Sequence, residues 1–204
     1  MSKRRRKKGA FVLISILILV CIVLYLILFH FIKAETKIID EIKKYGYTLD
    51  DRDTQLMQGI FSSLKDELNK SEVDYEKYAE YLSELFIVDL YTIDNKLNKY
   101  DVGGAEYVHP DHVNNYILKV EDTMYRYLEE STTRKDKMPE VSKISMKEIN
   151  EDSYTYGEKN YDAYVVTLNW EYQKDLGYDK QGIITLINDK DKLYVVEYIP
   201  EVIE

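Results

Sequence analysis

Hydrophobic side chains are continuous in one stretch of the chain, from Phe11 to Ile32. These 22 residues include no Lys, Arg, Asp or Glu. A helix rises about 1.5 Å per residue, so this stretch is long enough to cross a hydrocarbon core of roughly 30 Å. It is also longer than the h-region of a cleaved signal peptide, which has about 7–15 residues. We therefore expect an uncleaved transmembrane helix at 11–32, preceded by a short tail at 1–10.

After Ile32 the apolar residues recur at helical spacing. Residues 34–45 place their isoleucines on one side, which predicts a helix that either extends the span or lies at the membrane interface. Gly46 is expected to end it. Acidic residues at 48–53 then resemble the first turn of another helix, whose apolar stripe reaches Leu68. The pattern therefore predicts a juxtamembrane helical segment over residues 33–70.

The longest helical pattern begins after Ser71, which is a candidate N-cap, and carries apolar residues from Tyr75 to Leu97. Gly103 and Gly104 interrupt it, and we expect a turn there with positive φ. Residues 105–108 are interpreted as a short strand. Pro110 then fits the first turn of a further helix, with apolar side chains continuing to Leu128.

Beyond Pro139 the period changes from 3.6 to 2, which is typical of strands. In the strand expected at 160–173, alternate side chains share one face, and we expect Tyr164, Leu168 and Trp170 to face the long helix as core or pocket lining. A tight turn is expected at 188–191. The four predicted strands are 141–149, 160–173, 181–187 and 192–198.

Helices followed by a run of antiparallel strands indicate an α+β domain. We expect helices packed on a curved antiparallel sheet of about four or five strands. This domain is assigned to residues 71–204, after the anchor and the juxtamembrane segment.

Charge is distributed unevenly about the apolar stretch. The tail before it holds six bases and no acid, and the positive-inside rule therefore predicts a cytoplasmic N-terminus and an extracytoplasmic C-terminal domain. Without those six bases, 22 Lys and Arg residues remain against 37 acids, a net charge of −15. So acidic a domain repels phosphates, which argues against a nucleic-acid partner. The six bases of the tail are Lys3, Arg4, Arg5, Arg6, Lys7 and Lys8.

Candidate chemistry is sparse. The one cysteine, Cys21, lies inside the apolar stretch. His109 and His112 flank Asp111, but zinc sites use three or four protein ligands, and we expect the two imidazoles not to converge because Asp111 is interpreted as a helix cap. The acids near Asp50 fail the EF-hand pattern. With no Gly-x-Ser-x-Gly, P-loop or His-Glu-x-x-His motif, the sequence predicts no catalytic residue, cofactor or metal site.

The order and lengths of the elements between Ser71 and Pro200 resemble the nuclear transport factor 2-like, or cystatin-like, superfamily. That family wraps a bent sheet around a long helix to form a cone with a pocket. On a single N-terminal anchor with a basic tail, the arrangement resembles scaffold subunits of bacterial conjugation and type IV secretion machines. The resemblance implies protein partners in the cell envelope. The fold also occurs in small enzymes such as ketosteroid isomerases, so it does not decide function by itself.

The leading hypothesis is a non-enzymatic, single-pass interaction or scaffold protein of a bacterial cell-envelope complex. Its partners would be the membrane, envelope proteins and possible further copies of the chain. One alternative is a pocket-bearing ligand sensor or small enzyme on the same fold. Another is a cytoplasmic-facing regulator, if the chain has the opposite orientation.

Overall fold

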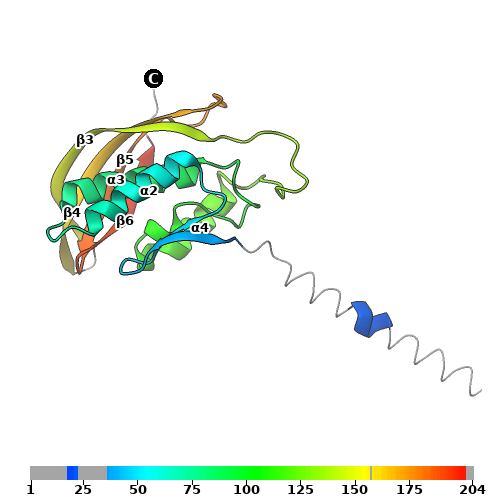
Figure 1. The fold of residues 1–204 in the computed structure, drawn as a ribbon, viewed down its shortest axis with the longest axis horizontal. Helices are drawn as coiled ribbons and strands as arrows, with labels where there is room; N and C mark the ends of the chain where they lie inside the picture. Colours follow the sequence, from blue (N-terminus) through cyan, green and yellow to red (C-terminus); the bar gives the residue numbers. More distant parts are fainter. Residues whose placement is uncertain (1–17, 23–35, 157, 201–204) are drawn as a thin grey trace, which may run out of the picture. The chain divides into compact units, whose positions relative to one another are not determined.

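The computed structural model describes residues 18–22, 36–156 and 158–200 (Figure 1). Residues 18–22 are helical and belong to a separate unit from the compact unit that begins at Ile38. Most of the predicted span at 11–32, and the whole tail at 1–10, lie outside the described residues. Within the part that is described, no helix has both the length and the apolar character needed to cross a bilayer.

The unit that begins at Ile38 has an α+β architecture, as the sequence predicts. Its four-stranded antiparallel sheet has the order β3-β4-β5-β6, and a separate hairpin is formed by β1 and β2. The long helix α3 lies against the sheet, and α2 packs on α3 (Figure 1). The elements are β1 (Ile38–Ile42), β2 (Tyr47–Asp50), α2 (Gln55–Leu68), α3 (Tyr75–Tyr91), η1 (Ala105–Tyr107), α4 (Pro110–Asp122), β3 (Val141–Tyr156), β4 (Lys159–Tyr172), β5 (Gln181–Asp189) and β6 (Lys192–Pro200).

The helix predicted at 34–45 is wrong, because residues 38–42 form the strand β1. β1 pairs with β2 across a turn in which Gly46 has a φ of +72°. Ile42 and Tyr47 flank this turn and are both buried. β-branched isoleucines suit a strand, and burial of the hairpin against the domain overrides the helical spacing.

Helices α2 and α3 begin later than predicted. Thr54 caps α2, since its side chain accepts a hydrogen bond from the backbone N–H of Met57. Asp74, rather than Ser71, caps α3 and accepts from the N–H groups of Glu76 and Lys77. The apolar stripe predicted to reach Leu97 also outlasts the helix, which ends at Tyr91 before the loop that leads to η1.

The sheet matches the predicted strands closely, although β3 extends to Tyr156 rather than 149. On β4 the alternation is confirmed, with Leu168 and Trp170 buried. β5 and β6 are joined by Lys190 and Asp191, both in the left-handed region, as a two-residue hairpin requires. The strand expected at 105–108 is instead the 3₁₀ helix η1, followed by one parallel bridge from Val108 to Val195 of β6.

Candidate functional site

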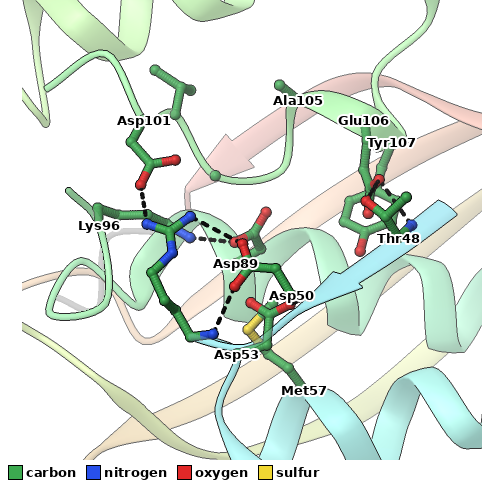
Figure 2. Close-up of a pocket in the computed structure, with 13 residues that line it drawn as sticks. Thr48, Asp50, Asp53, Met57, Asp89, Lys96, Asp101, Ala105, Glu106 and Tyr107 are labelled. Carbon is green, nitrogen blue, oxygen red and sulfur yellow. Dashed lines mark hydrogen bonds and ion pairs between the residues drawn. The ribbon is translucent and has the colours of Figure 1, made fainter. Parts of the chain in front are cut away.

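An acidic cavity of about 250 Å³ lies between the β2–α2 connection, the C-terminal part of α3 and the loop that precedes α4 (Figure 2). Five carboxylates and only two bases line it, so its lining has a formal excess of negative charge. The charged lining residues are Asp50, Asp53, Asp89, Asp101, Glu106, Arg52 and Lys96.

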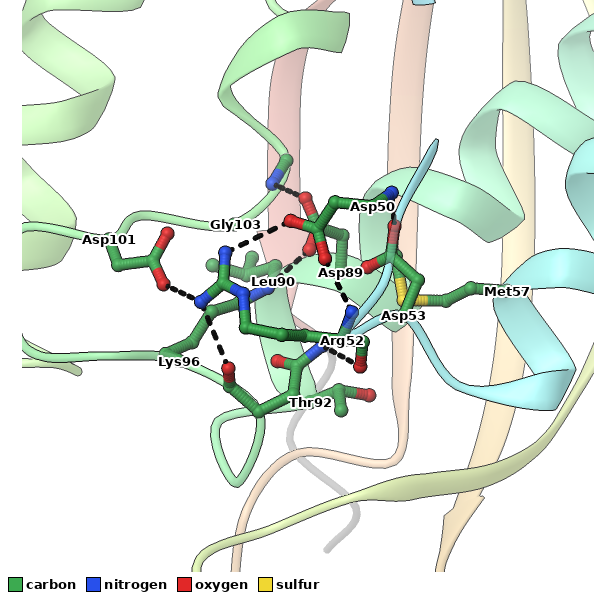
Figure 3. Close-up of polar contacts among 12 residues, drawn as sticks. Asp50, Arg52, Asp53, Met57, Asp89, Leu90, Thr92, Lys96, Asp101 and Gly103 are labelled. Atoms are coloured by element: carbon green, nitrogen blue, oxygen red, sulfur yellow. Dashed lines mark hydrogen bonds and ion pairs between the residues drawn. The ribbon is translucent and has the colours of Figure 1, made fainter. Parts of the chain in front are cut away.

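Arg52 joins three segments of the chain at this cavity (Figure 3). Its Nη2 lies 2.9 Å from Asp50 Oδ2, and its Nη1 donates to Asp101 Oδ2 at 2.5 Å and to the Asn95 carbonyl at 3.1 Å. A guanidinium has fixed, forked donors, so it suits this bridging of two carboxylates. Burial acts to raise the pKa of Asp101, but hydrogen bonds from Arg52 and from Leu97 N–H outweigh it and lower the pKa.

Asp89 organises the opposite wall. One of its oxygens accepts from Lys96 Nζ and the other from the backbone N–H of Gly104. Gly104 has a φ of +78°, as predicted for this turn, and at Gly103 a Cβ atom would lie only 2.1 Å from the Asp89 carbonyl oxygen. Glycine is therefore required at both positions, for different reasons.

Glu106 and Asp53 are the two acids of the cavity whose pKa values are raised. Burial raises the pKa of Glu106 to about 7, although hydrogen bonds from Thr48 to its carboxylate oppose the shift. Burial also raises the pKa of Asp53 to about 6, against a hydrogen bond from the N–H of Asp50. Glu106 Oε2 accepts from Thr48 N at 3.1 Å and Oγ1 at 3.0 Å, which attaches β2 to η1.

The cavity's two bases are therefore held by carboxylates of the chain itself, while two acids can exchange protons near neutral pH. Such carboxyl groups suit general acid–base chemistry, although structural networks shift pKa values in the same way.

The sequence indicated the acids near Asp50 only as a helix start. Their convergence with Glu106 depends on the hairpin that the helical interpretation of 34–45 missed. Among the described residues, no group of three or more His, Cys, Asp or Glu side chains is placed to hold a metal ion.

A second hollow, of about 490 Å³, lies between α4 and β6 and is called the groove below. Phe86 and Leu90 of α3 contribute apolar lining beneath it, with Val120 of α4 and Met124 from the turn that follows α4. Residues 195–200 of β6 form its other side. This volume is within the range of roughly 300–1,000 Å³ typical of ligand sites. The sequence did not predict the groove, because it is a consequence of where α4 packs.

The two histidines lie at the start of α4. His109 caps α4, with its Nδ1 accepting from the backbone N–H of Asp111 at 3.3 Å, so the prediction that Asp111 is the cap is wrong. The imidazole rings of His109 and His112 do approach, at 5.9 Å between centroids, contrary to expectation. His112 lines the groove, and its Nε2 is buried without a hydrogen-bond partner.

The side chains predicted as core or pocket lining belong to neither hollow. Leu168 and Trp170 are buried, and Trp170 packs 5.2 Å from the ring of Tyr91 on α3. Tyr164 is partly buried at the margin of the same core. The six bases predicted to orient the chain in the membrane lie outside the described residues.

Comparisons with protein-family models, with curated proteins and with solved structures found no match to this chain.

Proposed function

We propose that this chain is a membrane-tethered interaction domain of a bacterial cell envelope, and that the groove between α4 and β6 receives its protein partner. The observation that carries the proposal is an apolar hollow beside the terminal strand of a sheet. Exposed sheet edges can accept added strands, and apolar hollows beside them provide side-chain contacts. Ile199 of β6 lines the groove and is 47% exposed, so apolar surface is available to a partner there.

The sequence supports the tether and the orientation. The charge-free stretch at 11–32 has the length of a span, and the bases that precede it favour a cytoplasmic N-terminus. Helices packed on an antiparallel sheet are consistent with the nuclear transport factor 2-like resemblance, which suggests the scaffold role. In this proposal the chain is not an enzyme and uses no cofactor, and homo-oligomers are compatible with it.

Cysteine labelling tests the topology. In a full-length chain with Cys21 replaced by Ser, a cysteine at the exposed position Ser131 should react with an impermeant maleimide on intact cells. A cysteine at Ser2 should be protected until the cells are lysed. Equal protection at both positions would contradict the extracytoplasmic orientation.

Site-specific photo-cross-linking tests the role of the groove. The full-length chain would carry a benzophenone amino acid at Ile199, and a matched variant would carry it at Tyr127, which is 84% exposed outside the groove. We expect discrete adducts with an envelope protein from position 199 alone, identified by mass spectrometry. The same adduct pattern from both positions would count against a partner in the groove.

The raised pKa values of Glu106 and Asp53 favour a second candidate function, a small enzyme or sensor that uses the acidic cavity. Glu106→Gln and Asp53→Asn would then abolish ligand turnover or binding. If these variants change stability alone, the cavity has a structural role.

A further inference from the structure

Among the described residues, the outer edge of β6 is paired at one end, by Val108 and His109. β6 is the terminal strand of its sheet, and Val108 forms an isolated parallel bridge with Val195. The backbone N–H of His109 donates to the Val195 carbonyl at 2.9 Å, after which α4 begins at Pro110. Residues 196–200 line the groove beyond this point. A strand added to β6 can therefore pair along 196–200, and it must end where His109 occupies the edge.

The α4 side of the groove presents a row of hydrogen-bonding groups. His112, Asn115 and Lys119 are spaced three and four residues apart, so they lie on one face of the helix, and all three line the groove. On the strand side the one lining acid is Glu197, whose Oε2 is 3.5 Å from Thr185 Oγ1. The helix side therefore favours an anionic or oxygen-rich group over a cationic one.

His112 lines the groove, its ring lies 4.7 Å from that of Tyr156, and its Nε2 is buried without a hydrogen-bond partner. A buried polar atom without a hydrogen bond costs about 1–3 kcal/mol, so a ligand atom that bonds to it gains affinity. His112 lies in the first turn of α4, where the helix dipole is positive and stabilises a negative charge. Asp111, the acid of the same turn, lies 3.9 Å from His109 Nδ1 and its side chain is 62% exposed.

We propose that the groove binds the carboxy-terminal segment of a partner protein as an antiparallel strand on β6. The antiparallel direction carries the end of that segment toward Val195, so its terminal carboxylate meets His112. Because His109 occupies the edge at Val195, the added strand has to end there, which is why a chain end is required. Alternate apolar side chains of the segment pack on Met124 and Ile199, which line the groove and are partly exposed. This inference rests on the proposed function, because it names the class of partner for the same site.

Peptides with free and blocked ends test the inference. Random heptapeptides displayed with free carboxy termini would be panned on the full-length chain in lipid nanodiscs. An enriched peptide would then be synthesised as the acid and as the carboxy-terminal amide, and binding followed by fluorescence anisotropy. We expect the acid to bind at least about tenfold more tightly, as a lost charge-assisted contact implies. Methylation of alternate backbone nitrogens in the peptide should also abolish binding.

Substitutions at His112 and Lys119 test where the terminal carboxylate of the peptide binds. His112→Phe should reduce the acid-to-amide ratio toward one, and Lys119→Ala, which changes an exposed side chain, should weaken the acid more than the amide. Lys77→Ala on the exposed side of α3 is the matched control and should change neither. The inference is overturned if no peptide is enriched, if acid and amide bind equally, or if self-association of the chain displaces the peptide. Protein adducts at Ile199 with equal acid and amide binding would refute the inference and leave the proposed function intact.

Discussion

The two hollows differ in the polarity of their lining and in the pairing of their charges. In the acidic cavity, Arg52 and Lys96 are bonded to carboxylates from three segments of the same chain. In the groove, which is about twice as large, most of the lining is apolar and a buried imidazole nitrogen has no partner. Each hollow also holds one buried nitrogen without a hydrogen bond, Arg52 Nε in the cavity and His112 Nε2 in the groove. The contrast therefore lies in the lining: paired charges are typical of a structural network, whereas a mostly apolar hollow of this volume is typical of a binding site.

The largest expected effect is at Asp89. Asp89→Ala would leave the Lys96 ammonium, which is only 6% exposed, without its carboxylate and the Gly104 N–H without its acceptor. Breaking a buried ion pair from one side costs about 3–5 kcal/mol. Urea unfolding of the variant should show this loss, and Glu171→Ala, in the exposed pair with Lys143, should show almost none. Similar losses in both variants would refute a structural role for the cavity.

A smaller effect is expected at Gly103. In Gly103→Ala the new Cβ atom would meet the backbone of Asp89 at 2.1 Å, and overpacking of this kind costs about 1–3 kcal/mol or more. Gly59→Ala is the control, because it lies in α2 with no atom within 4 Å of the new Cβ. Helix propensity predicts that the control gains roughly 0.5–1 kcal/mol. Thermal unfolding should therefore shift in opposite directions, and a shift in the same direction would contradict the packing described for Gly103.

The third expected effect is a pH dependence of stability. The pKa of Glu106 is raised from 4.5 to about 7 and that of Asp53 from 3.8 to about 6, so the folded state holds these protons more tightly than the unfolded state. The contribution is complete below the ordinary pKa values and is lost as pH rises through about 6 to 7. The free energy of unfolding should therefore fall between about pH 5 and pH 8. The lowered pKa of Asp101 acts in the opposite sense, but only at more acidic pH.

Glu106→Gln should reduce this pH dependence, because the amide does not titrate, and the amide oxygen can still accept hydrogen bonds from Thr48. Urea unfolding at about pH 5 and at about pH 8 measures how much the free energy of unfolding changes between them. Glu148→Gln, on the exposed face of β3, is the control. An unchanged pH dependence in Glu106→Gln would place the pH sensitivity elsewhere, for example at Glu84, whose pKa burial raises to about 7.

The smallest effect on stability is expected in the groove. Ile199→Ser removes an apolar side chain that is already half exposed, and such substitutions usually change stability by less than about 0.5 kcal/mol. The same variant should weaken peptide binding, because it removes contact surface. A variant that is strongly destabilised would show that Ile199 belongs to the core rather than to a binding surface.

The sheet and the fold class could be predicted from the sequence because their signals are local. Alternation in β4 and the turn at Lys190 each lie within one strand or one hairpin. The helix predicted over 34–45 failed because packing decided between two plausible periods. Neither hollow could be predicted, since Glu106 meets Thr48, and His109 meets Val195 of β6, only after distant segments pack. Tyr164, Leu168 and Trp170 were expected as core or pocket lining, and they lie in and beside the core.

The strand order has a consequence for how the native protein opens. β3 to β6 follow one another in the sheet as in the chain, so each pairing joins neighbouring segments. The bridge between Val108 and Val195 instead connects parts of the chain that are far apart, through one short contact. Isolated contacts of this kind break in local fluctuations, while the central strands stay closed until global unfolding. The amide of His109 should therefore exchange its hydrogen faster than the amides paired between β4 and β5, and the sheet edge at the groove would open first.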